Sequence, residues 1–297
     1  MIKKTLYFGN PKYLSVSLQQ LKINNPNDAT TTSIPIEDIG IVVFDHPQIT
    51  YTQSVICQLI ENNAVLIWCG NNHLPISYTL PLAHNDIYSE KVKFQINASE
   101  PLKKQLWKQT VSQKLKNQIA VLDYFGYSTH KIERMIPKIS SGDVENFEGQ
   151  AAAIYWNQLF EDYNTRRGRN EAFPNAFFNY GYAILRAVIA RSLVGSGCLP
   201  VLGIHHTNKY NSYCLADDIM EPYRPIVDKM VLEYLITENP QHENLSTKDK
   251  AFLLQIPVID IRIDGKSSPL MVAAQRTTAS LDKCYQGILN KIKYPSL

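Results

Sequence analysis

The sequence lacks several features that would assign it to a specialised class. No apolar run approaches the roughly 20 residues that a membrane-spanning helix needs. The first residues, MIKKTLYFGN, contain no apolar stretch and no small-residue cleavage site, so we expect no signal peptide. The chain also has no internal repeat and no low-complexity tract. A globular chain of 297 residues, 44% of them hydrophobic, remains, and it is long enough for two domains.

Cysteine is scarce and scattered. The five cysteines include no CxxC pair, and their number is odd. This pattern argues against a disulfide framework and against a structural zinc site, and it fits a reducing compartment. The zinc-protease signature HExxH is absent as well. From the cysteine pattern we expect a cytoplasmic protein.

Charge is unevenly distributed along the chain, although the net charge is only +3. Residues 1–100 contain 6 Lys or Arg and 8 Asp or Glu, whereas residues 101–140 contain 8 basic and 2 acidic residues. A basic segment that follows an acidic one predicts a surface for a polyanion on the second part of the chain. The alternative is a solvated helix face.

The hydrophobic pattern changes near residue 100 and predicts an α+β fold. Short β-rich runs fill the first third, with one helical pattern at QSVICQLIENN. Mostly helical spacing follows, interrupted by a predicted hairpin with its turn at Asp264–Gly265. We predict a small N-terminal β domain with one helix over 1–85, a linker over 86–100 and a larger, mostly α-helical domain over 101–297. Helices are expected near 129–138, 144–163, 175–195, 216–235 and 270–290.

Acidic and imidazole side chains stand out at three places in the helical part. Glu148 precedes Gly and three alanines at the start of a predicted helix, where small residues permit a close approach. The alternative is a first-turn glutamate that complements the helix dipole. His205 and His206 are adjacent, and neighbouring side chains of an extended segment point to opposite faces. At most one of the two histidines is therefore expected to bind a metal.

The third place is the stretch LADDIMEPYRP. Asp217 and Asp218 lie four and three residues before Glu221, so either acid can share a helix face with Glu221. Pro222 follows directly and predicts a kink. Two carboxylates and one imidazole would suit Mg²⁺ or Mn²⁺. The alternative is an acidic cluster at a helix N-terminus.

A basic turn, NTRRGRN, lies between two of the predicted helices. Its arginines suit phosphate contacts, and the alternative is a solvated loop. With two basic residues near the acidic motif, they form the predicted DNA-contacting set: Arg166, Arg167, Arg169, Lys209 and Arg224. Arg224 has a second interpretation as an internal ion-pair partner of Glu221 or Asp218.

Five separated motifs resemble one known family. Two N-terminal motifs, IEDIGIVVFD and AVLIWCGNNHLPI, are followed in order by EGQAAAIYW, FNYGYAILRAVIAR and LGIHHTNKYNSYCLADDIMEPYRPIVD. Together they are similar to the CRISPR-associated integrases of spacer acquisition, the "Cas-one" family, and most similar to its type II branch. The resemblance covers essentially the whole chain. It implies an N-terminal β domain that serves dimerisation and a C-terminal helical catalytic domain.

The resemblance also implies a metal site and a reaction. The family's ligands correspond to Glu148, His206 and Glu221, with Asp218 as an auxiliary acid and His205 unassigned. The implied protein is a homodimer that works with a small "Cas-two" partner, and with other type II CRISPR proteins. With Mg²⁺ or Mn²⁺, it would insert short foreign DNA into a CRISPR array by 3′-hydroxyl attack on a phosphodiester. The competing hypotheses are a structure-specific DNA repair nuclease and a metal-free DNA-binding scaffold.

Overall fold

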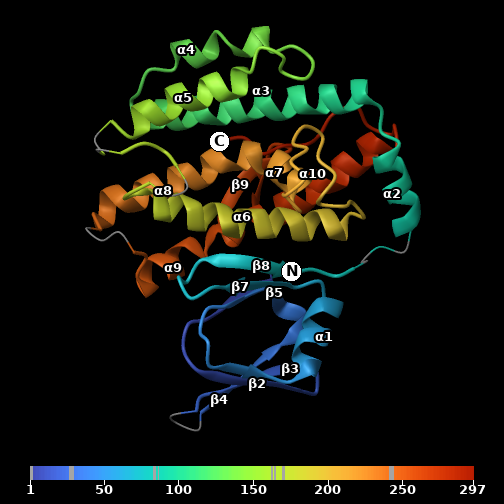
Figure 1. Cartoon of the computed structure of the whole chain (residues 1–297), viewed down its shortest axis with the longest axis vertical. Coiled ribbons are helices and arrows are strands. Elements are labelled where there is room, and N and C mark those ends of the chain that lie inside the picture. Colours follow the sequence, from blue (N-terminus) through green and yellow to red (C-terminus); the bar gives the residue numbers. More distant parts are fainter. Residues whose placement is uncertain are drawn as a thin grey trace. The chain divides into compact units, whose positions relative to one another are not determined.

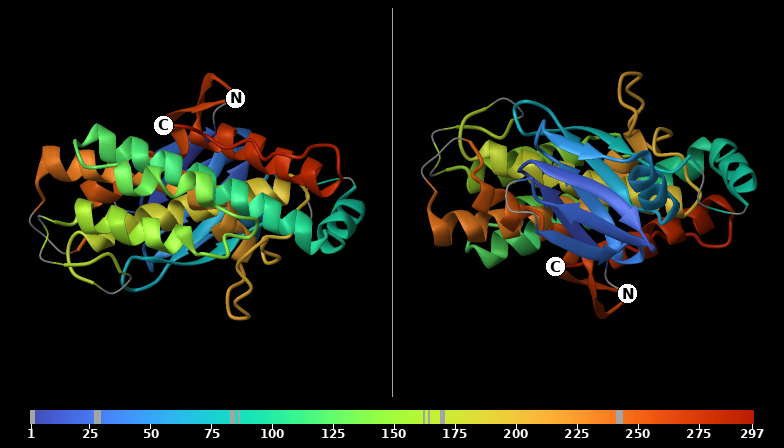
Figure 2. Two further views of the ribbon diagram at one scale, coloured as in Figure 1. Left: turned by 90° about the horizontal axis from the view of Figure 1, so that it is seen from above. Right: turned by 90° about the horizontal axis from the view of Figure 1, so that it is seen from below.

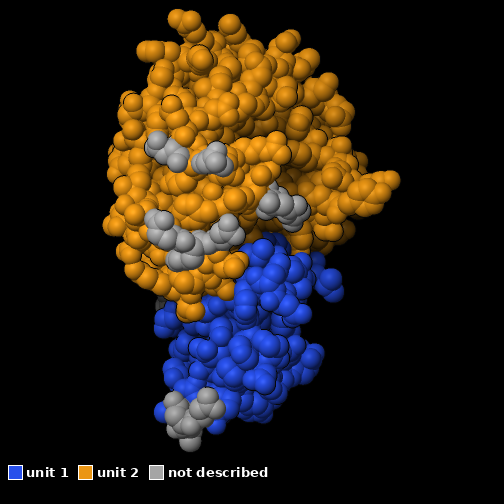
Figure 3. Space-filling view, turned by 60° about the vertical axis from the view of Figure 1, so that its left-hand side comes forward, with its two compact units in different colours: residues 1–84 blue, residues 85–297 orange. Residues whose placement is uncertain are grey.

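The computed structural model describes residues 3–26, 30–82, 85, 87–161, 163, 165–168, 171–240 and 244–297. The chain divides into two compact units, residues 1–84 and residues 85–297, which Figure 3 shows in different colours. Strands dominate the first unit and helices the second, so the predicted α+β class is confirmed. Among the described residues, no helix combines the length and the apolar content that crossing a membrane would take.

The first unit contains two four-stranded sheets and helix α1 (Gln53–Glu61) (Figure 1). In one sheet, three strands are parallel and the fourth is antiparallel, in the order β1 (Lys4–Phe8), β5 (Ile39–Phe44), β7 (Val65–Cys69) and β8 (Pro75–Thr79). The other sheet has the order β4 (Thr31–Pro35), β3 (Gln20–Asn24), β2 (Lys12–Ser17) and β6 (Ile49–Tyr51). The single helix predicted among these strands is confirmed.

The core of the first unit explains why β5 is apolar throughout. Its sequence IGIVVF is buried at every position, as expected for an inner strand of a mostly parallel sheet. Leu14 and Leu21 from the second sheet and Val55 and Leu59 from α1 belong to the same hydrophobic cluster. Alternate burial on the second sheet and helical spacing on α1 thus serve one core.

The β-rich stretch YLSVSLQQLKI is a hairpin of β2 and β3. Leu18 and Gln19 form its two-residue turn with φ of 51° and 58°. Such a turn needs positive φ at both central residues and usually takes Asn or Gly. Because the turn carries neither, the sequence gives no local signal for it.

The second unit is a helical assembly around α6 (Asn175–Gly195). This helix packs against α7 (Cys214–Met220), α8 (Arg224–Glu238), α9 (Thr247–Leu253) and α10 (Leu270–Tyr285). The long helix α3 (Glu100–Tyr124) runs beside α5 (Phe147–Leu159), as Figures 1 and 2 show. Helix α9 was not among the predicted helices. Arg191 and Ser192 of α6 are buried although both are polar.

The predicted linker over 86–100 is wrong. Residues Tyr88–Ile96 form helix α2, which belongs to the second unit. The reason is that two polar side chains of α2 bind to other residues of the second unit. Gln95 donates from Nε2 to the carbonyl oxygens of Leu199 and Leu202, and Lys91 forms an ion pair of 2.8 Å with Asp282.

Prolines set several helix boundaries of the second unit. The helix predicted over 129–138 is α4 (His130–Glu133) followed by the 3₁₀ turn η2 (Ile136–Lys138), which has Pro137 in its first turn. The kink predicted at Pro222 is the 3₁₀ turn η3 (Glu221–Tyr223) between α7 and α8. The predicted hairpin is confirmed, since β9 (Asp260–Ile263) and β10 (Lys266–Pro269) are antiparallel around Asp264–Gly265.

Candidate metal centre

Two of the predicted ligands, Glu148 and Glu221, meet at one buried lysine. Glu148 lies in the first turn of α5, and Glu221 begins η3 directly after α7. Lys114 of α3 forms an ion pair with Glu148 and a second, 2.5 Å long, with Glu221 Oε2. The side chains of Lys114 and Glu221 are 7% and 6% exposed, so both charges lie largely out of water. Three elements far apart in sequence thus place two carboxylates around one cation.

The electrostatics of this cluster keep its charges ionised. Burial alone would raise the pKa of Glu221, but the positive charges of Arg224 and Lys114 outweigh burial and lower it. Burial would likewise lower the pKa of Lys114, but Glu221 and Glu148 raise it overall. Arg224 adds a direct contact, with Nε at 3.2 Å from Glu221 Oε1. Glu221 is therefore a carboxylate between two cations.

Helix capping fixes the position of Glu148. Asp143 accepts hydrogen bonds from the backbone N–H groups of Phe147 and Glu148, at 3.0 and 2.9 Å. Asn146, with φ of 53°, accepts another from Gly149 N. A Cβ at Gly149 would lie 2.8 Å from the Asn146 amide, so this glycine makes room for the cap. The space beside Gly149, which was expected to admit another chain element, is thus occupied by Asn146. The alternative interpretation of Glu148 as a first-turn glutamate also agrees with this geometry.

His206 is oriented by Asp218, whose carboxylate is fully buried. His206 Nδ1 lies 2.5 Å from Asp218 Oδ1, and this contact is the main reason that the pKa of His206 is raised. Asp218 also accepts from the backbone N–H groups of Ile204, His205 and His206. Because Nδ1 donates to the carboxylate, Nε2 is the nitrogen that remains to bind a metal. Asp218 therefore serves as a positioning residue.

Gly203, three residues before His206, is required by this turn. A Cβ at residue 203 would lie 2.3 Å from the carbonyl oxygen of His206 and 2.8 Å from Asp218 Oδ2. Any larger residue would push the carboxylate away from the three N–H groups that it accepts from. The glycine thus permits the turn that presents His206.

The neighbouring polar residues of the motif have other partners. The His205 ring stacks on Trp107 with centroids 4.1 Å apart and planes 1° apart. Burial lowers the pKa of His205, which favours the neutral ring for stacking. Asp217 forms an ion pair with Arg186, from Nε to Oδ1 at 2.6 Å. No described hydrogen bond or ion pair joins either residue to Glu148 or Glu221, but the charge of Glu148 acts to raise the pKa of His205 against burial, so leaving His205 unassigned stays a prediction.

The donor set suits a hard divalent cation, although its members are not yet gathered around one point. Among the described residues, no group of three or more His, Cys, Asp or Glu side chains has metal-binding spacing. Glu148 and Glu221 nevertheless already converge on the ammonium of Lys114, and Glu221 is close enough to raise the pKa of His206. Two carboxylates and one imidazole nitrogen match the preferences of Mn²⁺ and, with added waters, Mg²⁺.

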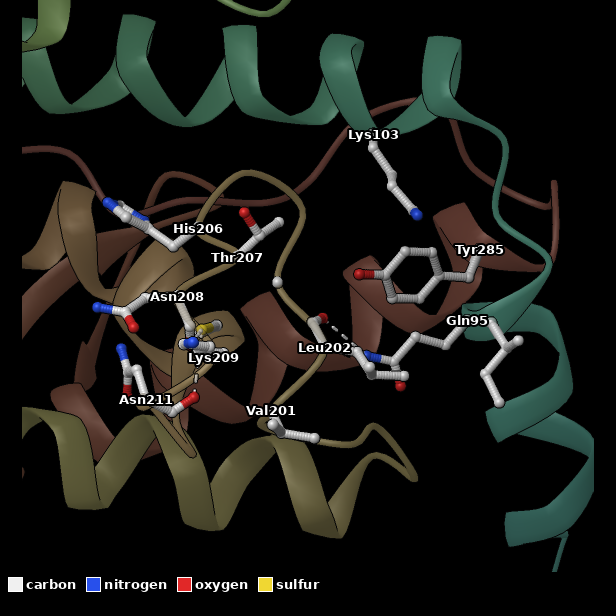
Figure 4. A pocket seen from close by; sticks show the side chains of 13 residues that line it. Gln95, Lys103, Val201, Leu202, His206, Thr207, Asn208, Lys209, Asn211 and Tyr285 are labelled. Atoms are coloured by element: carbon white, nitrogen blue, oxygen red, sulfur yellow. Dashed lines mark hydrogen bonds between the residues drawn. The ribbon is translucent and has the colours of Figure 1, made fainter.

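The predicted DNA-contacting residues do not form one cluster. Arg166 is exposed and pairs with Glu171 at 2.9 Å, whereas Arg169, also predicted to contact DNA, lies outside the described residues. Lys209 lines a cavity of about 600 Å³ with His206 at its edge, shown in Figure 4. Arg167 and Arg224, with Lys114, line a second, smaller cavity. For Arg224 the ion-pair interpretation holds, because it contacts Glu221.

Lys114 is not among the residues predicted from the sequence, although a signal for it exists. Val111, Leu115, Val121 and Leu122 mark the buried face of α3, and Lys114 falls on the same face. A lysine where the spacing requires an apolar residue indicates a buried charge that must have a partner. In a segment rich in exposed lysines, this one is distinguished only by its position.

Asp228 of α8 provides a pH-dependent prediction. Burial raises its pKa to about 7, against hydrogen bonds from Tyr182 and Tyr155 that lower it. An unfolded aspartate titrates near 4, so between about pH 4 and pH 7 the folded state holds the extra proton and stability falls as pH rises. Between about pH 5 and about pH 8 we expect about 3 kcal/mol of this loss to disappear in Asp228→Asn. Urea unfolding of both proteins at about pH 5 and about pH 8 would measure it; parallel pH profiles would contradict the prediction.

Comparison with known proteins agrees with this architecture. The family model for CRISPR associated protein Cas1 matches residues 6–260. The CRISPR-associated endonuclease Cas1 of Neisseria meningitidis serogroup C (strain 8013) is 34% identical over 282 residues, which are 94% of this chain and 91% of that protein.

Two solved structures share the fold at low sequence identity. A casposase bound to integration product has a TM-score of 0.80 at 18% identity. The match covers 98% of this chain and 92% of the casposase chain. A chain of a Cas6-RT-Cas1–Cas2 complex has a TM-score of 0.74 at 17% identity. The match covers 97% of this chain and 35% of the chain in the complex. The family match and the relative together confirm the resemblance drawn from the sequence motifs: this chain belongs to the CRISPR-associated Cas1 family.

Proposed function

We propose that this protein is a divalent-metal-dependent DNA integrase and endonuclease that inserts short foreign DNA into a CRISPR array. The observation that carries the proposal is the convergence of Glu148 and Glu221 on one buried cation, next to a histidine oriented by a buried carboxylate. Family membership supports the activity, since the Neisseria relative is named an endonuclease. The similar casposase, bound to its integration product, supports strand transfer as the chemistry.

In the proposed reaction one phosphodiester is exchanged for another. The 3′-oxygen of the captured DNA forms a bond to a phosphorus at the leader–repeat boundary, and the bond from that phosphorus to the displaced strand breaks. Glu148, Glu221 and His206 Nε2 would hold Mg²⁺ or Mn²⁺. When bound, the cation would activate the hydroxyl and offset the charge that develops on the phosphoryl oxygens. No covalent link to the protein forms, and hydrolysis follows the same course with water as the nucleophile.

Residues around the ligands support this role by orientation and charge. Asp218 keeps the His206 ring in one orientation and leaves Nε2 available. Arg224 and Lys114 lower the pKa of Glu221, so its carboxylate stays ionised. The capping of α5 by Asp143 and Asn146 holds the backbone of Glu148 in place. These contacts fix the orientation, charge or backbone position of each predicted ligand before any substrate binds.

We propose further that the active form is a homodimer, joined through the N-terminal β unit, that works with a small Cas2-type partner and with type II CRISPR proteins. The similar Cas6-RT-Cas1–Cas2 complex supports a Cas2 partner. Substrates would be a double-stranded prespacer and the CRISPR repeat, and the mildly basic composition is compatible with DNA.

An integration assay tests the proposed function. A labelled duplex with free 3′-hydroxyl ends is incubated with a repeat-bearing plasmid, with Mn²⁺ or with EDTA, and with or without the Cas2-type partner. We expect label to enter the plasmid at the repeat only with metal, and far more with the partner. Cleavage of branched DNA without insertion would instead support a repair nuclease. The absence of Mn²⁺ binding at millimolar metal would support a metal-free scaffold.

A further inference from the structure

A small polar cavity lies beside Lys114, the buried lysine that pairs with Glu148 and Glu221. Its volume is about 220 Å³, below the roughly 300 Å³ at which pockets for drug-sized ligands begin. Three cationic side chains, Lys114, Arg167 and Arg224, line it, together with Gln118, Tyr182 and Asp228. Lys114 and Arg224 are also the residues that contact Glu221. The cavity is thus directly connected to the candidate metal centre.

The guanidinium groups of Arg167 and Arg224 both lie over the ring of Tyr182. The guanidinium carbon of Arg167 lies 5.2 Å from the ring centroid of Tyr182, and that of Arg224 lies 4.8 Å from it. Arg167 also lies 5.3 Å from the centroid of Trp156. Cation–π contacts hold both side chains in place, but they do not remove the repulsion between two positive charges. An anion in the cavity would relieve it.

The acids near the cavity leave this positive charge uncompensated. Within the described part of the chain, Arg167 donates from Nη1 to Gly168 O and to Asn175 Oδ1 and has no carboxylate at ion-pair distance. Glu221 and Glu148 already share Lys114. The remaining acid, Asp228, has a pKa raised by burial to about 7, so near neutral pH it contributes at most part of a negative charge. Three cations therefore face less than three negative charges.

Arg224 and the side-chain amide of Gln118 have polar atoms that could bind a ligand. Arg224 Nε lies 3.2 Å from Glu221 Oε1, but this buried nitrogen makes no hydrogen bond to a described residue. Gln118 is 2% exposed, and its Oε1 has no hydrogen-bond partner among the described residues. Because the oxygen and nitrogen of an amide are interchangeable by rotation, Gln118 can offer an N–H instead. A planar guanidinium and an amide donor are groups that bind phosphate oxygens.

We propose that this cavity is a phosphate subsite that binds a backbone phosphate of the DNA strand next to the one that reacts, with Arg167 and Arg224 as its principal donors. The proposal rests on the proposed function for its choice of DNA, but the site itself follows from the cavity and its charges. Its small volume suits a phosphate group rather than a whole nucleotide. Through Arg224 and Lys114, the bound phosphate would place the strand relative to Glu221.

The test is DNA binding in EDTA, where no strand transfer occurs, so its outcome is independent of the integration assay. Fluorescence anisotropy measures the affinity of the full-length protein for a labelled single-stranded oligonucleotide at several salt concentrations. We expect Arg167→Gln to bind about ten-fold more weakly and to lower the slope of log affinity against log salt by about 0.7, the value for one lost phosphate contact. Arg262→Gln is the control, because Arg262 is exposed, lies outside the cavity and is not among the predicted DNA-contacting residues, and it should leave both quantities unchanged.

Further arms distinguish the alternatives. Arg167→Lys keeps the charge and should retain most of the affinity, and thermal unfolding of each variant shows that a weakened variant is still folded. Inorganic phosphate should compete with the oligonucleotide for the unmodified protein but not for Arg167→Gln. Equal losses in Arg262→Gln and Arg167→Gln would overturn the proposal in favour of a diffuse basic surface. Phosphate binding by titration, with no change of salt slope in Arg167→Gln, would overturn the DNA assignment and leave a site for free phosphate.

Discussion

Replacement of Glu221 by glutamine should abolish strand transfer, with a rate at least about a thousand-fold lower in Mn²⁺. A divalent cation at a phosphoryl group contributes several kcal/mol of transition-state stabilisation, and each 1.4 kcal/mol corresponds to about ten-fold in rate. The amide keeps the shape of the carboxylate but supplies no negative charge to the metal. Glu148→Gln and His206→Ala should have losses of the same order, because each removes one of the three proposed ligands. Gel analysis of the integration assay described above measures all three.

The structure supplies a matched control for these variants. Glu145 lies three residues before Glu148 in the same segment, and it is exposed. Glu145→Gln removes an equal charge and should integrate DNA at the normal rate. Thermal unfolding must show that each inactive variant is folded, since Glu221 is buried and pairs with Lys114 and Arg224. Normal integration by a folded variant of any one of the three residues would exclude that residue as a ligand.

The two hairpins show which parts of the fold the sequence could predict. Asp264 and Gly265 have φ of 52° and 74°, which these residue types tolerate, so their turn was predicted and is confirmed. Leu18 and Gln19 adopt φ of 51° and 58° in an equivalent turn, but these residue types give no sign of it. That turn is held by the pairing of β2 with β3 and of β3 with β4, which is tertiary information.

The same distinction applies to the candidate site. The motifs identified Glu148, His206, Asp218 and Glu221 because each lies in a local pattern, EGQAAA, GIHH or DDIME. No local pattern shows that Asp218 is fully buried under three backbone N–H groups. Nor does one show that Lys114, 34 residues from Glu148, lies between the two glutamates. Those facts depend on how α3, α5 and η3 pack together.

Lys114→Met should make the metal-free protein less stable and the metal-bound protein comparatively more stable. Without the ammonium, Glu148 and Glu221 lose the cation they share, and breaking a buried ion pair from one side costs about 3–5 kcal/mol. Urea unfolding in EDTA measures this loss. Lys116→Met is the matched control, because Lys116 is exposed on the same helix and should change stability by no more than about 0.5 kcal/mol.

Mn²⁺ should then reverse the loss, because metal and lysine compete for the same carboxylates. In the unmodified protein a bound cation has to displace Lys114 or tolerate its positive charge nearby, whereas the methionine variant has no such competitor. We expect about ten-fold tighter Mn²⁺ binding by the variant in isothermal titration, and a larger increase of its unfolding free energy with added Mn²⁺. Adding Glu148→Gln to Lys114→Met should recover part of the metal-free stability and remove the response to Mn²⁺. If Mn²⁺ bound the variant more weakly than the unmodified protein, Lys114 would instead be a support of the metal site, and the competition between lysine and metal would be excluded.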